Sequence, residues 1–133
     1  MKTYLFACVH NAGRSQMAAA FFTALADPAK ARARSAGTAP GERVHPEVVA
    51  AMREAGIDLS GAQPAKLTPD LAAEASLLVT MGCGDACPYV PGLRIEDWPL
   101  QDPKGQPPDV VHRIRDDIRA RVIDLIARED IGR

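Results

Sequence analysis

The chain lacks an excess of charge of either sign. Its 16 Lys and Arg stand against 17 Asp and Glu, for a net charge of -1. A nucleic-acid-binding surface or a membrane-binding basic patch needs a surplus of basic residues, so neither is expected. Also missing are an apolar run long enough to span a membrane and, in the opening residues, the features of a secretory signal. We therefore expect a cytoplasmic protein without nucleic-acid or membrane partners.

Internal repeats, low-complexity tracts and linker-like segments are missing as well. The 133 residues, 47% of them apolar, suffice for one compact core and are too few for two. Proline and glycine gather between the segments that predict helices and strands, as is typical of loops. We expect residues 1–133 to form a single domain that acts as a monomer.

Cysteine is scarce, with three residues, Cys8, Cys83 and Cys87. Because a reducing cytosol disfavours structural disulfides, two interpretations are open. The thiols are either buried and inert, as free cysteines usually are, or they perform redox or nucleophilic chemistry. The spacing of Cys83 and Cys87 does not match a structural zinc site, so no metal is expected. Across one helical turn their Cα atoms would lie about 6 Å apart, which permits a disulfide and favours thiol–disulfide exchange.

Short apolar segments alternate with amphipathic ones along the chain. The first kind predicts buried strands and the second predicts helices with one apolar face. Such alternation indicates an α/β fold with a mostly parallel sheet covered on both faces. The expected strands are Thr3–Ala7, Arg32–Ala36, Ser76–Met81 and Arg94–Trp98, and the expected helices are Ser15–Leu25, Pro46–Ala55, Pro69–Glu74 and Asp109–Ala127.

Chemically active side chains follow three of the predicted strands. Cys8 follows the first, Cys83 and Cys87 follow the third, and Asp102 follows the fourth. In open α/β sheets, ligands bind beyond the carboxyl ends of the strands, so these side chains are expected at one edge of the sheet. This convergence favours the redox or nucleophilic interpretation of the cysteines.

The stretch "CVHNAGRS", residues 8–15, joins the first strand to the first helix. A loop of this length can turn several backbone N–H groups inward, and the helix dipole strengthens the anion-binding nest that they form. The same field favours the nucleophilic thiolate of Cys8. Arg14 adds a planar fork of donors that fits a tetrahedral oxyanion. The expected oxyanion-binding residues are Val9, His10, Asn11, Ala12, Gly13, Arg14 and Ser15.

Three residues of this loop have further expected roles. Gly13 permits a close backbone approach. The Asn11 side chain can brace the loop through hydrogen bonds to its backbone, and the Ser15 hydroxyl can donate to the Cys8 sulfur. A nucleophile, an oxyanion cradle and a guanidinium together suit attack on a phosphate-like centre.

Asp102 is the candidate general acid or base. Since Asp-Pro also begins ordinary turns, its position past the fourth strand is what favours the catalytic interpretation. His10 either shapes the pocket or only holds the loop. His45 and His112 are expected to be surface or helix-capping residues, and Trp98 is expected to pack in the core or in a pocket wall.

These motifs resemble the arsenate reductases built on the low-molecular-weight protein tyrosine phosphatase fold. The "MGCGDACP" stretch points to the reductases, because a plain phosphatase needs no second and third cysteine. Phosphatases also have an aromatic residue after their Asp-Pro, where this chain has Lys104. The resemblance covers nearly the whole chain and rests on "CVHNAGRSQMA" from Cys8, "SAGT" from Ser35, "EAGIDLS" from Glu54, "VTMGCGDACP" from Val79 and "EDWPLQDPKGQ" from Glu96.

The resemblance implies a three-layer α/β/α fold with four parallel strands in the order 2-1-3-4. It also implies a detoxification mechanism without a bound cofactor. Arsenate, or a related oxyanion such as phosphate or sulfate, enters the nest. Cys8 attacks arsenic while Asp102 helps to expel water, and Cys83 then attacks Cys8 so that arsenite leaves. Cys87 next attacks Cys83 and carries the disulfide to the surface, where a thioredoxin reduces it.

The chain departs from the thioredoxin-coupled reductases in two respects. Its two later cysteines are closer together, and Ala18, Ala19 and Ala20 stand where those members have an acidic residue linked to a potassium site, so that site is not expected. The compact "CGDACP" resembles members that pass arsenate to a small thiol such as mycothiol, with a glutaredoxin-like partner; there Cys8 alone would suffice. Two further hypotheses are a tyrosine phosphatase and a non-enzymatic oxyanion sensor.

Overall fold

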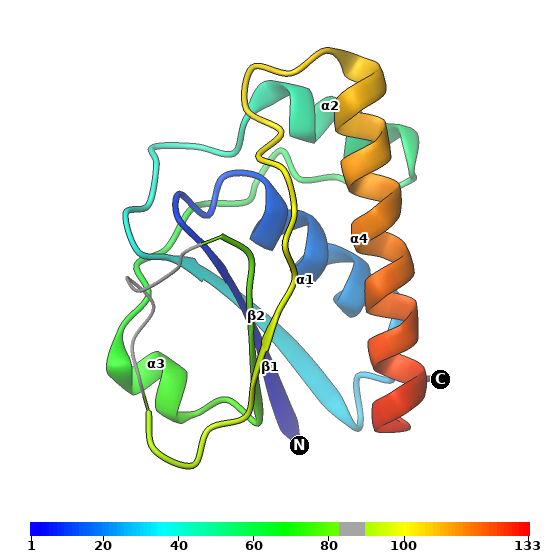
Figure 1. Ribbon diagram of the computed structural model, residues 1–133. Helices are drawn as coiled ribbons and strands as arrows, with labels where there is room; N and C mark the ends of the chain where they lie inside the picture. The colour runs from blue at the N-terminus through cyan, green and yellow to red at the C-terminus, as the bar shows by residue number, and fades with distance from the viewer. Residues whose placement is uncertain (83–89) are drawn as a thin grey trace.

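The computed structural model describes residues 1–82 and 90–133, and a parallel sheet of four strands forms its middle layer (Figure 1). The strand order is β2-β1-β3-β4, and each neighbouring pair is parallel. The predicted α/β class and the strand order implied by the resemblance are confirmed. The strands are β1 (Lys2–Cys8), β2 (Ala31–Gly37), β3 (Leu77–Thr80) and β4 (Ile95–Asp97), and the helices are α1 (Arg14–Leu25), α2 (Pro46–Glu54), α3 (Pro69–Ala73) and α4 (Pro108–Glu129).

Alternate residues of β1 face two separate cores. Tyr4, Phe6 and Cys8 belong to the larger core, together with buried residues of α1, α2 and α4. Leu5 and Ala7 point the other way and pack in a smaller core with residues around α3. In Figure 1, α1 and α4 accordingly lie on one side of the sheet and α3 on the other. This arrangement is the expected three-layer architecture, because a strand whose two faces are both buried needs helices on each side.

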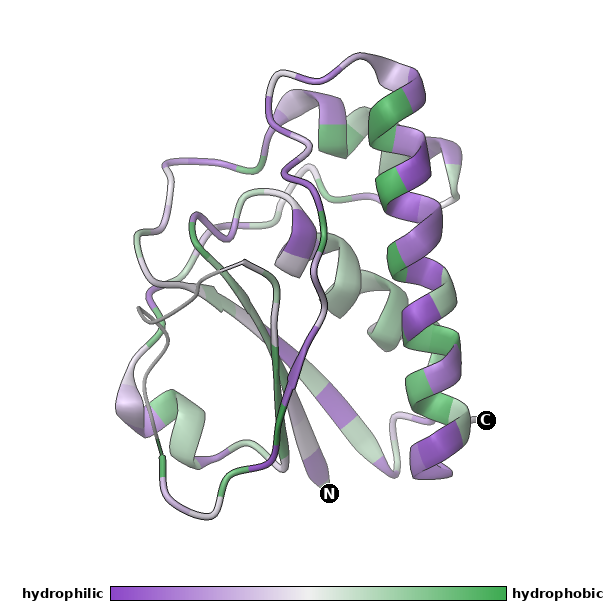
Figure 2. Ribbon diagram, viewed as in Figure 1, coloured by the Kyte–Doolittle hydropathy of each residue, from purple (hydrophilic) through white to green (hydrophobic). Residues whose placement is uncertain are grey.

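Helix α4 packs against α1 and α2 in the larger core with a single apolar stripe. Figure 2 shows hydrophobic residues at intervals along α4, separated by hydrophilic ones. Spacings of three and four residues put the apolar positions on one face of the helix. No described helix is both long enough and apolar enough to cross a membrane. The buried residues of this stripe are Val111, Ile114, Ile118, Val122, Leu125 and Ile126.

Most element boundaries differ from the predicted ones by one or two residues. Helix α1 begins at Arg14 rather than at Ser15. Strand β4 is shorter than the predicted Arg94–Trp98, yet the Trp98 N–H donates to the Thr80 carbonyl at 2.8 Å, and the Arg94 carbonyl accepts from the Leu78 N–H at 2.9 Å. Backbone pairing therefore spans the predicted length, although the regular strand does not.

The register of the sheet brings the strand ends to one edge. Cys8 lies opposite Gly37 on β2, Ala7 lies opposite Thr80 on β3, and Thr80 lies opposite Asp97 on β4. Loops that leave these strand ends therefore start side by side. This is the edge at which the sequence predicts the functional site.

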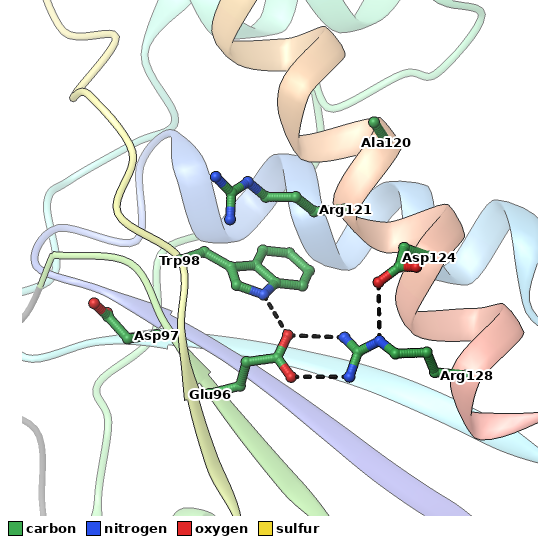
Figure 3. Close-up of a pocket in the computed structure, with 7 residues that line it drawn as sticks. All are labelled: Glu96, Asp97, Trp98, Ala120, Arg121, Asp124 and Arg128. Atoms are coloured by element: carbon green, nitrogen blue, oxygen red, sulfur yellow. Dashed lines mark hydrogen bonds and ion pairs between the residues drawn. The ribbon is translucent and has the colours of Figure 1, made fainter.

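Trp98, just past β4, packs in the core as predicted. It is 3% exposed, and its ring centroid lies 5.8 Å from that of Phe6. Its indole N–H donates to Glu96 at 2.6 Å, and Glu96 also accepts from Arg128 at 2.9 Å (Figure 3). Charged residues of β4, of α4 and of the segment before β4 thus form two groups of ion pairs, Glu96–Arg128–Asp124 and Arg94–Glu129. We refer to Arg94, Glu96, Asp124, Arg128 and Glu129 as the charged wall.

Candidate active site

Cys8, the predicted nucleophile, is the last residue of β1 and is 2% exposed. The loop after it wraps back over the sheet edge before α1 begins at Arg14. Several carbonyls of this loop accept hydrogen bonds from the N–H groups of segment 38–45, at 2.8–3.3 Å. In a trans peptide the next N–H points opposite to the carbonyl, so the following amides are turned to the inner side of the loop. The bonded carbonyls are those of Cys8, Val9, His10 and Ala12.

The contact predicted between Ser15 and Cys8 is present. Ser15 Oγ lies 2.8 Å from Cys8 Sγ, and Asn11 Nδ2 lies 2.7 Å from the same Oγ. An amide N–H can only donate, so Ser15 accepts from Asn11, and its own proton is free to point at the sulfur. The hydroxyl is therefore set up to donate to Cys8, which stabilises a thiolate more than a thiol.

Asn11 braces the loop, but not through the partners that the sequence suggested. Its side chain bonds to Ser15, and its Oδ1 accepts from the Ala65 N–H at 2.9 Å and from Gln16 Nε2 at 3.2 Å. Asn11 itself lies in the left-handed region, with φ 50°, which asparagine tolerates better than most residues. Its amide thus joins the loop to α1 and to segment 63–65 instead of to the loop's own backbone.

Gln16 is a member of the site that sequence reasoning missed. It is buried, and its Nε2 approaches the Asn11 carbonyl at 3.1 Å and the Gln63 carbonyl at 3.2 Å, in addition to Asn11 Oδ1. One amide group thus joins the nucleophile loop to a segment 47 residues away. A glutamine one residue after Ser15, at the start of a helix that packs on the sheet, was the available signal, since a buried amide seldom lacks partners.

Arg14 points across the sheet edge toward loops that come from β3 and β4. Its guanidinium donates to the Leu100 carbonyl at 3.1 Å and lies 3.9 Å from the Asp102 carboxylate. Gly82, which follows β3, approaches so closely that a Cβ there would lie 2.6 Å from Arg14 Nη1. The structure thus brings Cys8, Arg14, Ser15 and Asp102 to one edge, as the sequence predicts, and adds Leu100 and Gly82.

Asp102 fits both interpretations that the sequence left open. Its Oδ1 accepts from the Lys104 N–H at 3.0 Å, which is the bond of an ordinary Asx turn. Its Oδ2 faces Arg14, and 43% of its side chain is exposed. The turn holds one carboxylate oxygen, and the other stays open to solvent beside the guanidinium. Such a carboxyl group can exchange protons with a bound molecule.

Two glycines let neighbouring loops close over the nucleophile loop. A Cβ on Gly13 would lie 2.9 Å from Pro103 Cγ, so the lack of a side chain at Gly13 makes room for the proline that follows Asp102. A Cβ on Gly37 would lie 2.6 Å from the Val9 carbonyl oxygen. Side chains at these positions would push the loops apart, because real Cβ atoms do not approach other atoms so closely.

The histidines lie at the rim of the site or away from it. His10 and His45 line a cavity of about 480 Å³ with Arg43 and Lys104. His45 precedes α2 at its N-cap position, without a capping bond from its side chain. His112, on α4, lies 2.6 Å from Glu54 at the surface, as predicted for a surface residue.

Two of the predicted site residues, Cys83 and Cys87, lie outside the described residues. Within residues 1–82 and 90–133, the only free cysteine is Cys8, and no group of three or more His, Cys, Asp or Glu residues could hold a metal ion. The predicted roles of the two later cysteines therefore remain predictions.

Comparison with known proteins supports the resemblance stated from the sequence motifs, over most of the chain. The sequence profile described as low molecular weight phosphotyrosine protein phosphatase matches residues 3–86. A Halobacterium salinarum protein that is provisionally named an arsenate reductase is 40% identical over 126 residues, which cover 90% of this chain and 87% of that protein. The glutaredoxin arsenate reductase of Synechocystis is 37% identical over 131 residues, which cover 96% of this chain and 98% of that protein.

Among solved structures, the thioredoxin-dependent arsenate reductase of Corynebacterium glutamicum superposes with a TM-score of 0.81 at 38% identity. The match covers 94% of this chain and 60% of that chain, which is therefore considerably longer. The resemblance that the sequence motifs indicated is confirmed by these matches.

Proposed function

The chain belongs to the low molecular weight phosphotyrosine protein phosphatase family, and we propose that within it this protein is an arsenate reductase that converts arsenate to arsenite. The observation that carries the proposal is the 2.8 Å contact between Cys8 Sγ and Ser15 Oγ, inside a loop whose amides turn inward. A stabilised thiolate beside an oxyanion cradle suits attack on a tetrahedral arsenate. The arsenate reductases among its relatives favour reduction over hydrolysis.

The first step uses the described residues. Arsenate sits in the inward-facing amides, and Arg14 neutralises its charge. The Cys8 thiolate attacks arsenic and forms a sulfur–arsenic bond, while one arsenate oxygen leaves as water. Asp102 supplies a proton to that leaving oxygen. The arsenic is still As(V) after this step, because the attack exchanges one ligand for another without transferring electrons.

The reduction itself needs a second thiol. In the proposed relay, the Cys83 thiolate attacks the Cys8 sulfur and forms a Cys8–Cys83 disulfide. The sulfur–arsenic bond breaks and its electron pair goes to arsenic, which leaves as arsenite. Cys87 then attacks Cys83, frees Cys8 and leaves a Cys83–Cys87 disulfide, which an external dithiol such as thioredoxin reduces. The relay consumes two electrons per arsenate and fits a reducing cytoplasm.

A small-thiol route is the second candidate. There the thiol, mycothiol or a similar molecule, attacks arsenic in the Cys8 adduct, forms a new sulfur–arsenic bond and displaces the Cys8 thiolate. A thiolate of a glutaredoxin-like protein then attacks the sulfur of the released adduct, so that a mixed disulfide forms, the sulfur–arsenic electron pair goes to arsenic, and arsenite leaves. The short "CGDAC" spacing and the glutaredoxin arsenate reductase of Synechocystis support it. Phosphate-ester hydrolysis is the third candidate, supported by the family's description.

One assay matrix separates these candidates. Arsenate turnover is followed with thioredoxin, thioredoxin reductase and NADPH, and in parallel with a small thiol and a glutaredoxin-like protein. Each Cys→Ser variant is tested in both systems, and hydrolysis of an aryl phosphate is measured alongside. The Cys8→Ser variant is expected to lose turnover in both systems, since Cys8 forms the sulfur–arsenic bond in both proposed routes.

The Cys83→Ser and Cys87→Ser variants identify the electron donor. Both are expected to fall to background with thioredoxin, because the relay cannot be completed. Full thioredoxin-linked activity in Cys83→Ser would contradict the relay. Activity of that variant only with the small thiol would favour the second candidate. Efficient hydrolysis of the aryl phosphate without arsenate reduction would contradict the reductase assignment altogether.

A further inference from the structure

Gly82 lies against the guanidinium of Arg14, the residue that is proposed to clamp the oxyanion. A Cβ built on Gly82 would lie 2.6 Å from Arg14 Nη1 and 3.5 Å from its Cζ. Arg14 is itself 8% exposed and is tied to the Leu100 carbonyl on another loop. The nitrogen that donates to Leu100, Nη1, is thus also the atom that a side chain at Gly82 would displace.

The conflict at Gly82 differs in kind from those at Gly13 and Gly37. At Gly37 the opposing atoms include backbone, and at Gly13 they belong to a rigid proline ring, so a side chain there would move whole loops. At Gly82 the opposing atom is the end of a long side chain, which can swing aside on its rotatable bonds. The least costly response to a Cβ at Gly82 is therefore displacement of the Arg14 guanidinium, not of the fold.

We propose that Gly82 is a positioning residue that sets the affinity of the site for oxyanions by leaving room for the Arg14 guanidinium. The proposal rests on the proposed function insofar as the oxyanion is arsenate. It concerns binding and not electron transfer, so it can be tested with inorganic phosphate, which has the same tetrahedral shape and charge. A guanidinium binds such an anion through two parallel hydrogen bonds, which need a fixed orientation.

The chain offers two matched controls. Gly82 has φ +86°, and Gly56 and Gly92 have φ +85° and +82°. A Cβ at either control position would meet nothing within 4 Å. Alanine at any of the three positions therefore carries a similar backbone strain, and only at Gly82 does it also displace Arg14. The strain alone should lower Tm by about 3–6 °C in each variant.

The test is the dissociation constant of inorganic phosphate for the full chain, measured by titration calorimetry in Gly82→Ala, Gly56→Ala and Gly92→Ala. We expect Gly82→Ala to bind phosphate about tenfold more weakly or worse, because a hydrogen-bonded ionic contact is lost. The two controls should stay within about twofold of the wild type. Wild-type affinity in Gly82→Ala would overturn the proposal, and so would an equal loss in all three variants.

Folding is checked by Tm and circular dichroism in the same variants. The Tm of the Gly82→Ala variant should fall no further than that of the controls, since the Arg14 side chain moves aside and the backbone does not have to. If it fails to fold while both controls fold, the proposal is wrong, because backbone and not Arg14 then meets the Cβ. Arsenate turnover by the wild type is measured separately. If the wild type shows no arsenate turnover, the proposed function is wrong, and the phosphate measurement still decides the role of Gly82.

Discussion

The nucleophile loop and the charged wall are both networks of polar side chains, yet they are built differently. In the loop, Asn11, Ser15 and Cys8 are buried and bond across four to seven residues of sequence. In the wall, Arg128 reaches Glu96 across 32 residues and Arg94 reaches Glu129 across 35, at the surface. The contacts among Cys8, Asn11 and Ser15 are therefore local in sequence, although the loop is also held by segments 38–45 and 63–65. The wall has no such local part and forms only after β4 and α4 have packed.

Burial decides what each network contributes. A buried hydrogen bond that loses one partner costs the full desolvation of the other, whereas an exposed ion pair contributes about 0–1 kcal/mol. The wall still affects its members: the hydrogen bonds from Arg94 lower the pKa of Glu129. Burial beside Glu129 raises the pKa of Tyr4, whose hydroxyl donates to that carboxylate, to about 12. Loop variants should thus cost more free energy than wall variants.

The largest expected effect is that of Gln16→Glu. The new carboxylate would face the carbonyl oxygens of Asn11 and Gln63 in place of an N–H donor. We expect a loss of about 3 kcal/mol in the free energy of unfolding at pH 7, measured by urea denaturation. The loss should be smaller at pH 4, because a protonated carboxyl can still donate one hydrogen bond.

The matched control is Gln63→Glu, which adds the same charge on the segment that Gln16 contacts. The Gln63 side chain takes no part in the network, to which only its backbone carbonyl contributes. Its stability should stay within about 0.5 kcal/mol of the wild type. Equal losses in the two variants would show that charge, and not the buried amide contacts, governs the effect.

The next effect is that of Ser15→Ala. It removes the hydroxyl that lies 2.8 Å from Cys8 Sγ and leaves Asn11 Nδ2 without its partner. We expect kcat/KM for arsenate to fall about 10- to 100-fold, the value of a hydrogen bond to a charged group. The exposed Ser60→Ala variant serves as the control and should keep wild-type kcat/KM. Unchanged turnover in Ser15→Ala would mean that the loop amides alone stabilise the thiolate.

The smallest effect is expected in the wall, from Glu129→Gln. Since the folded pKa of Glu129 lies below its ordinary 4.5, its contribution to stability is complete above that pH and is lost as the pH falls through the folded value. Between about pH 6.5 and pH 3, the wild type should lose more stability than the variant, by less than about 1 kcal/mol. The exposed Glu74→Gln variant should follow the wild type. A pH effect larger than about 1 kcal/mol would show that the wall contributes as much to the free energy of unfolding as the loop does.

The same contrast explains which features could be predicted from sequence. The Cys8–Ser15 loop is contiguous, so its residue types and spacing indicate the nest, the nucleophile and the helix that follows. The role of Gln16 was missed because two of its three oxygen partners are backbone carbonyls, and a carbonyl leaves no trace in the sequence. From the sequence, Asp102 could only be predicted to follow the fourth strand. That its carboxylate lies 3.9 Å from the Arg14 guanidinium is known only from the structure.

By itself, the sequence determined the alternation of strands and helices, and with it the parallel sheet and the position of Cys8 at the end of the first strand. These are local properties, set by hydrophobic period and by the residues that begin and end each element. The tertiary structure alone decided what surrounds Arg14: Gly82 past β3, with Leu100 and Asp102 past β4. The reason is physical, since these contacts join loops 68 to 88 residues from Arg14, which meet only when the register of the sheet has aligned the strand ends.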